Sequence, residues 1–212
     1  MSGFFCRYSV FCPPIDCPVF LCYKKSGHDQ MDSLQKWNAV INLNERGVRQ
    51  AYKKLGVFGT IRKTGFLNVL MMKVDDLAGM LETLRRWTLE DPQSLSFLSR
   101  VIPAAVTFTF QSPEEFEARA AEAVLQWAQA LTGKGFHVRM RRRGFKGKLS
   151  SLDEEHFLDN TLLAAIEKAG APGQITFDDP DAIIAVETIG PWAGLSIWSR
   201  EELQRYPFIK LN

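Results

Sequence analysis

Short apolar strands alternate with amphipathic helices from Trp37 onward, and this alternation constrains the fold more than any other feature of the chain. The first part shows a strand, a basic helix, two strands joined by a glycine turn, a helix that Asp75 can cap and a last extended run. These segments lie at 37–43, 46–55, 57–62, 67–73, 77–87 and 97–110. The order β-α-β-β-α-β predicts a small ferredoxin-like α+β unit.

Two helix starts organise the second part of the chain. Ser112 can cap a helix that has Pro113 at its first position and Glu115 as the partner in a capping box. A strand, a second helix with a capping box at 151–154, three short strands and a last helix follow, at 136–143, 151–170, 174–177, 182–188, 194–198 and 200–206. This order predicts an α/β domain after the first unit, so the whole chain is expected to be an α+β protein.

Residues 1–30 differ from everything that follows them. They lack helical periodicity, contain three prolines and hold all four cysteines, Cys6, Cys12, Cys17 and Cys22. The cysteines are not arranged as CxxC pairs, so the signal for a zinc site is weak. We predict a poorly structured extension at 1–30, with no metal or cofactor; an upstream start codon before Met31 is an alternative explanation. The domains are then expected at 31–110 and 111–212.

The most informative stretch for function is Lys134–Lys148, KGFHVRMRRRGFKGK. It carries seven permanent positive charges and no acid, although the net charge of the whole chain is only +2. Alternation along a strand would bury Phe136, Val138 and Met140 on one face and place arginines on the other. The glycines then permit a tight loop, and a helix begins at the serines that follow. The basic residues are Lys134, Arg139, Arg141, Arg142, Arg143, Lys146 and Lys148.

This pattern predicts a surface that contacts a phosphate backbone. Arginine forks match phosphate oxygens, lysines add point charges, and the backbone N–H groups near Ser150 and Ser151 at a helix start favour an anion. The same residues could instead form a solvated charged strand, pair with distant acids or dock an acidic protein. A nucleotide-binding P-loop is excluded, because Arg142 and Leu149 occupy the positions that the motif reserves for glycine and serine or threonine.

The ordered set of segments resembles a THUMP domain, and more narrowly the stand-alone THUMP proteins related to the adaptor of tRNA N4-acetylcytidine synthesis. The features that carry the resemblance are the RRRGFKGKLSS loop, the turn Asp178–Asp181, Glu187 within VETIG and the AGLS of Ala193–Ser196. The upstream segments WNAVINLNERG and SRVIPAAVTFTF resemble the N-terminal ferredoxin-like unit of those proteins. The resemblance covers roughly residues 35–212 and leaves residues 1–30 without a counterpart.

The resemblance implies binding of tRNA by its acceptor arm, in support of a separate tRNA-modifying enzyme, with an RNA cytidine acetyltransferase as the leading partner. Thiolation or methylation is the alternative. The basic residues named above, Ser150 and Ser151 would contact RNA, and Arg200 could extend the patch. Trp198 could stack on a base from an exposed face, or pack between the two units.

Catalysis by the chain itself is not expected from the sequence. After the two units there is no room for a fused catalytic domain, and neither a GxGxxG nor an HxE…PCxxC motif is present. An enzyme with an unrecognised site is the competing class. The region after Met31 contains no cysteine, which fits a reducing cytoplasm.

Overall fold

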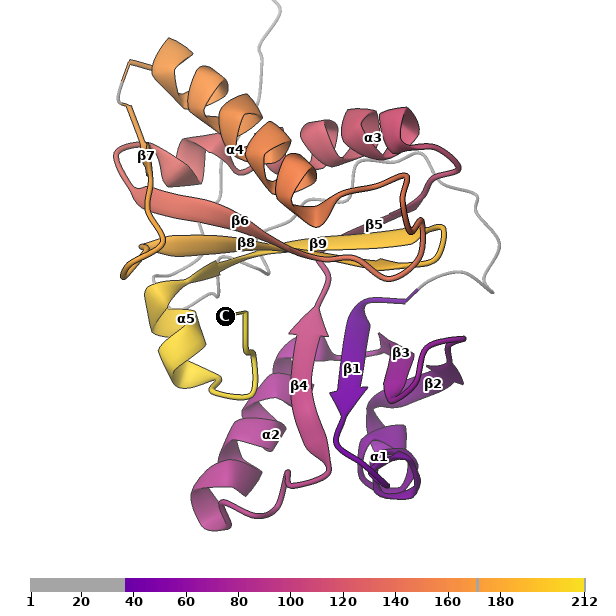
Figure 1. Cartoon of the computed structure of the whole chain (residues 1–212). Helices are drawn as coiled ribbons and strands as arrows, with labels where there is room; N and C mark the ends of the chain where they lie inside the picture. The colour runs from indigo at the N-terminus through magenta and orange to yellow at the C-terminus, as the bar shows by residue number, and fades with distance from the viewer. Residues whose placement is uncertain (1–36, 171, 212) are drawn as a thin grey trace, which may run out of the picture.

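The computed structural model describes residues 37–170 and 172–211, and its elements form two β-sheets with five α-helices (Figure 1). The predicted extension at 1–30 and its four cysteines lie outside the described residues. The α+β class that the sequence predicts is confirmed. Among the described helices, none is long and apolar enough to cross a membrane.

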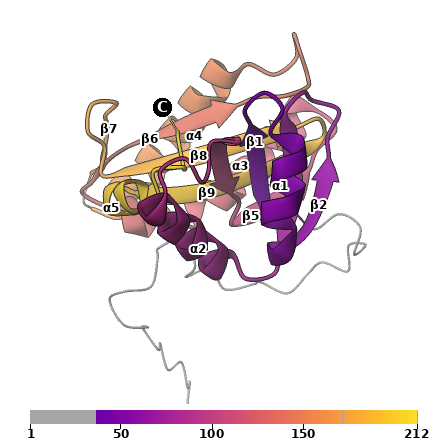
Figure 2. The same cartoon turned by 90° about the horizontal axis from the view of Figure 1, so that it is seen from below.

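The first sheet holds four strands in the order β2-β3-β1-β4, and every neighbouring pair is antiparallel. The chain order β-α-β-β-α-β is the one predicted, and α1 and α2 lie on the same side of this sheet (Figure 2). Several boundaries differ from the predicted ones by a few residues; for example, Gly56–Phe58 form a 3-10 turn before β2, and Asp76, not Asp75, caps α2. The elements are β1 (Ala39–Leu43), α1 (Val48–Leu55), β2 (Gly59–Lys63), β3 (Val69–Val74), α2 (Leu77–Glu90) and β4 (Leu98–Pro103).

The second sheet holds five strands in the order β5-β9-β8-β6-β7. Strand β6 runs parallel to β7 and β8, and the remaining pairs are antiparallel. Its elements are β5 (Val106–Thr109), α3 (Pro113–Leu125), a 3-10 helix (Ala128–Leu131), β6 (Gly135–Arg141), α4 (Ser151–Lys168), β7 (Gln174–Ile175), β8 (Ala182–Ile189), β9 (Trp192–Ser199) and α5 (Arg200–Arg205).

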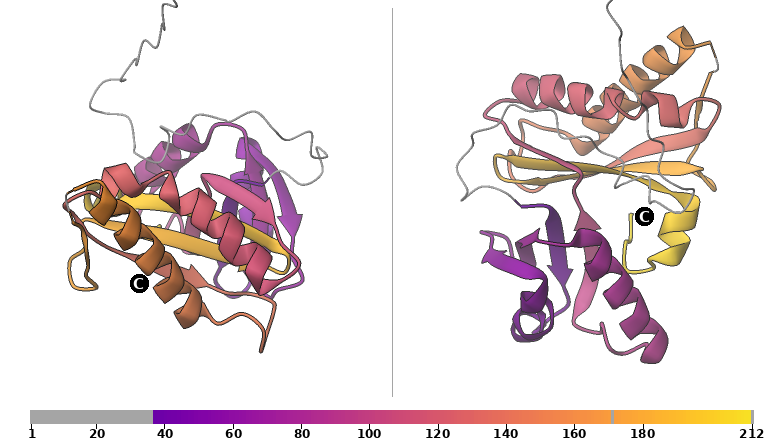
Figure 3. Two further views of the ribbon diagram at one scale, coloured as in Figure 1. Left: turned by 90° about the horizontal axis from the view of Figure 1, so that it is seen from above. Right: turned by 180° about the vertical axis from the view of Figure 1, so that it is seen from behind.

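The helices of the second part begin near the predicted residues, but the predicted capping boxes do not form, because the Glu115 carboxylate accepts from the Gln111 N–H and the cap of α4 is shifted by one residue. Ser112 accepts a hydrogen bond from the Glu115 N–H and has Pro113 next to it, as predicted. For α4 the capping residue is Ser150, whose hydroxyl accepts from the Asp153 N–H, rather than Ser151. Helices α3 and α4 lie side by side across one face of the second sheet (Figure 3) and close an apolar core with it.

The other face of the second sheet packs on the first unit through a shared core. Ile183, Ala185 and Ile189 of β8 belong to the same buried cluster as the strands of the first sheet. The segment after α5 joins this cluster, where the Val101 N–H donates to the Phe208 carbonyl over 3.0 Å. Strand β5, on the N-terminal side of the predicted boundary at residue 110, pairs with β9 in the second sheet.

Trp198 lies in this shared core and is 0% exposed. Its indole N–H donates to the Ser196 hydroxyl over 2.8 Å. Of the two sequence-based alternatives for Trp198, packing between the units is the one observed. The prediction of an exposed ring that stacks on a base is wrong, because residues of β8 and β9 facing the first unit are covered by it.

Candidate nucleic-acid interface

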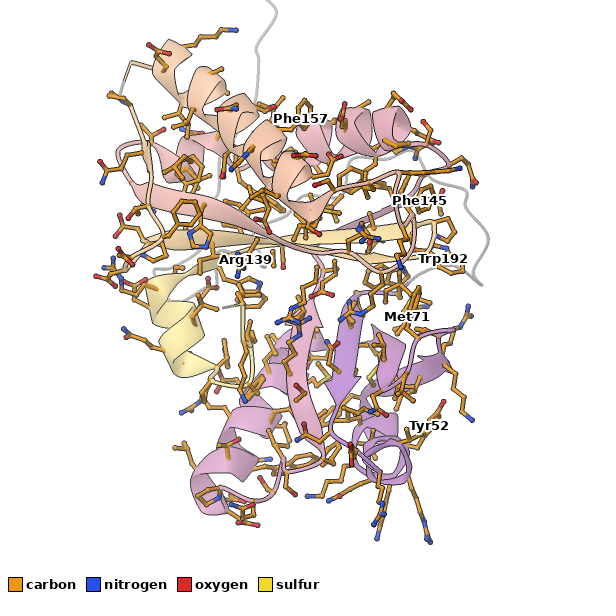
Figure 4. All side chains as sticks on the ribbon, in the orientation of Figure 1. Tyr52, Met71, Arg139, Phe145, Phe157 and Trp192 are labelled. Atoms are coloured by element: carbon orange, nitrogen blue, oxygen red, sulfur yellow. The ribbon has the colours of Figure 1, made fainter. Side chains whose placement is uncertain are left out.

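Strand β6 divides its side chains between two faces in the predicted way. Phe136, Val138 and Met140 are buried in the core beneath the helices. Arg139 and Arg141 are exposed on the opposite face, and Figure 4 places Arg139 on the side of the sheet that faces the first unit. The alternation follows from the pleat, which sends successive side chains to opposite faces. The arginines stay exposed because β6 lies near the edge of the sheet.

Carboxylates of α4 complete the hydrogen bonding of β6 where β7 no longer pairs with it. Strand β7 pairs only with the first two residues of β6. Further along, the Val138 N–H donates to Asp159 over 2.8 Å, and the Met140 N–H donates to Glu155 over 2.6 Å. Burial raises the pKa of Asp159 to about 6, against the lowering by the Val138 N–H. These acids are thus engaged with the backbone of β6.

Arg143 is built into the contact between the two units. Its guanidinium donates to Glu187 over 2.5 Å and to the Asn42 side-chain oxygen over 2.6 Å. Arg100 donates to the other oxygen of Glu187 over 3.2 Å, and the side chains of Arg100 and Glu187 are only 5% and 4% exposed. Burial lowers the pKa of Arg100 to about 10, and the nearby Glu187 opposes this shift. The prediction of Arg143 as a free surface cation is therefore corrected.

The loop after β6 is held at both ends and presents two lysines between them. Gly144, at a φ of +99°, lies against the backbone of Gly190, where any side chain on residue 144 would clash. Phe145 packs on Phe110 with ring centroids 4.7 Å apart, and Leu149 is buried. Lys146 and Lys148 are exposed. The loop therefore holds the backbone of these two lysines in place near the end of β6.

Arg142 is intermediate between the buried Arg143 and the exposed lysines of the loop. It is half-buried, and its guanidinium donates to the carbonyl of Gly144 within the same turn. This bond orients the side chain along the loop and leaves part of the guanidinium exposed. Arg142 therefore belongs with the loop lysines rather than with the buried Arg143.

Lys134 and Arg200 lie at the opposite end of β6. With a rise of about 3.3 Å per residue, Lys134 is roughly 23 Å along the strand from Arg141. Its charge acts on Glu201, and Arg200 forms ion pairs with Asp179 at 2.9 Å and Asp181 at 3.1 Å. This corner of the molecule is mixed in charge, so the structure does not bring Lys134 and Arg200 together with the loop lysines.

Of the two serines at the start of α4, only Ser150 has a capping role. Ser150 is exposed and caps the helix, while Ser151 is half-buried as its first residue. Asp153 and Glu154 occupy the first turn, which places negative charge near the N–H groups that an anion would use. Burial raises the pKa of Glu154 to about 7, with Glu117 and Asp153 adding to the shift. An anion at this helix start would have to compete with these carboxylates.

A second basic region extends from the basic helix that the sequence predicts into β2 and β3, whose basic residues the sequence analysis did not single out. Residues 46–73 carry seven basic residues and no acid, as many as the segment 134–148, but spread over a longer stretch. Among them, Arg62 and Lys63 of β2 line a pocket between the two units, together with Lys73 of β3. A count of charge over whole elements, in place of short windows, would have found this region.

Several solved structures are similar to this chain, and three of them illustrate the similarity. The crystal structure of PH1313 from Pyrococcus horikoshii matches 76% of this chain and 54% of its own length, with 15% identity and a TM-score of 0.52. A possible methylase from Clostridium difficile 630 matches 76% of this chain and 40% of its own, with 16% identity and a TM-score of 0.51. A 4-thiouridine synthetase solved with RNA and ATP matches 77% and 42%, with 12% identity and a TM-score of 0.46.

These similarities establish the fold, which is THUMP-like, as the sequence predicts. The chain spans about half or less of the length of the solved chains that it matches. No protein-family model matches the chain, and no curated protein is similar to it in sequence.

The prediction that the chain is not an enzyme is corrected by the same comparison. A protein described as a possible methylase shares this fold over 76% of the present chain. The fold therefore occurs in a larger chain that is described as a possible methylase, so short length and missing motifs do not exclude catalysis. Within the described residues, no cluster of His, Cys, Asp and Glu side chains is arranged to hold a metal ion.

Proposed function

We propose that this protein binds the acceptor arm of tRNA and presents it to a tRNA-modifying enzyme. The observation that carries the proposal is a run of exposed cations on one edge of the second sheet: Arg139 and Arg141 on β6, then Lys146 and Lys148 on the anchored loop. Arginine and lysine side chains at fixed positions suit the phosphates of a nucleic-acid backbone. The sequence resemblance to THUMP proteins supports tRNA as the nucleic acid.

Rigidity of this surface supports the proposal as much as its charge. Arg143 fixes the loop to Asn42 of the first unit and to Glu187 of β8, and Phe145 fixes it to the helix-side core. Cations that are already positioned lose less conformational freedom when they meet a phosphate. The buried arginine therefore contributes by holding the neighbouring cations in place.

By the same resemblance, cytidine acetylation by a separate acetyltransferase is the modification that we propose first. Methylation is the second candidate, because a protein of this fold is described as a possible methylase. In either case the chain would raise the effective concentration of tRNA near the reacting enzyme. Pull-down from native extract, with sequencing of bound RNA and identification of bound proteins, distinguishes the two.

The direct test is the salt dependence of tRNA binding by the full chain. Four phosphate contacts predict a slope of log K against log salt of roughly −3 to −4. Each of the substitutions Arg139→Ala, Arg141→Ala, Lys146→Ala and Lys148→Ala should make the slope shallower by about 1.

Lys134→Ala provides the matched control for this series. Lys134 belongs to the same stretch of sequence but lies at the far end of β6, near Glu201. We expect the slope of log K against log salt for Lys134→Ala to equal that of the unaltered protein. Equal slopes for all five variants, or binding that does not depend on salt, would remove the support for this surface.

A further inference from the structure

A pocket of about 330 Å³ opens between the first sheet and the turn that joins β8 to β9. Trp37, Met71 and Ile189 form its buried apolar floor, each less than a tenth exposed. Phe66 and Trp192 are half-buried walls. Figure 4 shows Trp192 above Met71 on the two sides of this gap. An apolar floor between aromatic walls suits an apolar side chain of a partner.

The pocket lies beside one edge of the first sheet. Strand β2 is the outermost strand of that sheet and pairs only with β3 in the described part of the chain. At the opposite edge, the Val101 N–H of β4 already donates to the Phe208 carbonyl. Every second residue of an edge strand directs its N–H and C=O groups away from the neighbouring strand, where another strand can pair with them. Strand β2 therefore offers a template for an added strand.

The register of β2 and β3 connects this edge with the pocket. Arg62 lies opposite Met71, and Thr60 lies opposite Lys73, so these four side chains share one face of the sheet. Three of the four, Arg62, Met71 and Lys73, line the pocket. Successive side chains of a strand point to opposite faces. Alternate side chains of a strand added beside β2 would therefore point to the same face as the pocket.

The charge around this edge selects an acidic partner. Residues 46–73 carry seven basic residues and no acid. Lys63 and Lys73 are exposed at the rim of the pocket, and neither forms an ion pair within the described part of the chain. A second copy of this edge would bring like charges together, which disfavours self-pairing. Carboxylates on an added strand would instead meet the lysines.

The tip of the β2–β3 hairpin favours a protein over a nucleic acid as the occupant. Leu67 at the tip is 90% exposed and lines a second hollow, which shares Phe66 with the pocket. Exposed aliphatic side chains and strand edges are recognised by the apolar side chains and the backbone amides of a polypeptide. A phosphate backbone makes use of neither feature.

We propose that β2 and the adjoining pocket bind an extended, acidic segment of a partner protein. The segment adds as a strand beside β2 and inserts an apolar side chain between Trp192 and Phe66, and its carboxylates meet Lys63 and Lys73. The inference goes beyond the proposed function, because the cations assigned to tRNA lie on β6 and the loop after it, in the second sheet.

The test begins with a phage-displayed library of random peptides of about eight residues, a length that spans a strand. The library is selected on the full chain. Enriched peptides should carry an apolar residue with aspartate or glutamate two positions away, on the same face of the added strand. Enrichment of basic peptides, or of none, would overturn the inference.

The enriched peptide is labelled with a fluorophore, and its binding to variants of the full chain is measured by anisotropy. Lys63→Glu and Lys73→Glu place a like charge at the rim and should weaken binding about 10-fold or more. Trp192→Ala removes a wall of the pocket and should have an effect of about the same size. Because Lys73 is exposed, Lys73→Glu stays informative if Trp192→Ala does not fold.

Lys168→Glu is the matched control for the two lysine variants. It makes the same charge reversal at the exposed end of α4. At physiological salt its affinity for the peptide should stay within about 2-fold of that of the unaltered protein, because distant surface charges are screened. Equal affinities of all four variants would overturn the assignment to this edge.

Methylation of the peptide backbone tests whether the segment adds as a strand. One alternate set of peptide N–H groups faces β2, and the other faces water. N-methylation of the first set should weaken binding about 5-fold or more for each hydrogen bond that is lost, and methylation of the second set should be tolerated. Equal effects of the two sets would overturn strand addition.

Binding of tRNA separates this inference from the proposed function. Displacement of the peptide by tRNA, together with a loss of tRNA binding in Lys63→Glu and Lys73→Glu, assigns these cations to RNA and overturns the docking of a protein. Peptide binding by a chain that does not bind tRNA supports the inference and overturns the proposed function. Salt-dependent tRNA binding by a chain that enriches no peptide has the reverse meaning.

Discussion

Arg141 and Arg143 stand two residues apart at the end of β6, yet they occupy opposite environments. Arg141 is exposed beside the loop lysines, whereas the side chain of Arg143 is 15% exposed and donates to Glu187 and Asn42. In sequence both belong to one run of three arginines. The difference arises from packing, because Arg141 is the register partner of Glu187 on β8, yet the ion pairs of Glu187 in the described part of the chain are with Arg100 and Arg143. A dense run of cations is therefore a mixture of surface and interior residues until the fold assigns each one.

The largest expected effect is on the buried ion cluster itself. Glu187→Gln leaves Arg100 and Arg143 without their shared carboxylate, and breaking a buried pair in this way costs about 3–5 kcal/mol of unfolding free energy. Denaturant unfolding at neutral pH measures the loss. Glu167→Gln, an exposed change near the end of α4, should stay within about 0.5 kcal/mol. Equal stability of both variants would mean that Glu187 does not hold the two arginines.

The next test sets the two arginines against each other. Arg143→Ala removes charged hydrogen bonds to Glu187 and Asn42 and should lower the unfolding free energy by about 1.5–3 kcal/mol. Arg141→Ala should change stability by less than about 0.5 kcal/mol and instead make the salt slope of tRNA binding shallower by about 1. If both variants changed stability equally, the contrast between the two residues would be lost.

The buried carboxyl group of Glu154 makes the stability of the protein fall as the pH rises. Burial raises the pKa of Glu154 to about 7 from its ordinary 4.5, so the folded protein binds a proton there that the unfolded chain has released. Stability from this group is full below about pH 4.5 and falls as the pH rises towards 7. Glu154→Gln should therefore stabilise the protein at pH 8, by about 1–3 kcal/mol, and have little effect at pH 4.5. Unfolding at both pH values, with Glu167→Gln as control, checks this; an equal effect at both values would contradict it.

The smallest effect is expected at the start of α4. Ser150→Ala removes the hydroxyl that accepts from the Asp153 N–H, and loss of such a cap costs about 1 kcal/mol. Ser150→Asp keeps a capping oxygen and should retain most of the stability. If Ser150 also holds a phosphate, Ser150→Ala will weaken tRNA binding as well, and isothermal titration measures that second effect. A stability equal to that of the unaltered protein would show that the cap is dispensable.

Local signals predicted the elements well, and they failed where the outcome depended on contacts distant in sequence. The helix start at Ser112 and the two faces of β6 were readable because capping and pleating depend on neighbouring residues. The run 97–110 was read as one extended segment, but it divides into β4 and β5 in different sheets. Pro103, the last residue of β4, is a local sign of that division. Which sheet each strand joins is not readable locally, since each strand finds its partner far along the chain.

In the candidate site, too, the sequence predicted the features that depend on neighbouring residues and failed for those that depend on distant contacts. Exposure of Arg139, Arg141, Lys146 and Lys148 followed from the sequence pattern. The burial of Trp198, the ion pairs of Arg200 and the pocket around Trp192 did not, because each involves elements from distant parts of the chain. The pocket draws on both units, so no single stretch of sequence contains its pattern.

The sequence alone determined which segments are strands and helices, which face of each is apolar, and that one strand and its loop carry concentrated positive charge. Those properties depend on side chains within a few residues of one another. Only the tertiary structure decided which cations stay in water, because this depends on where Glu187, Asp179 and Asp181 come to lie. A charge is neutralised by whatever carboxylate the fold brings within a few ångströms, and that distance is set by packing between elements far apart in the chain.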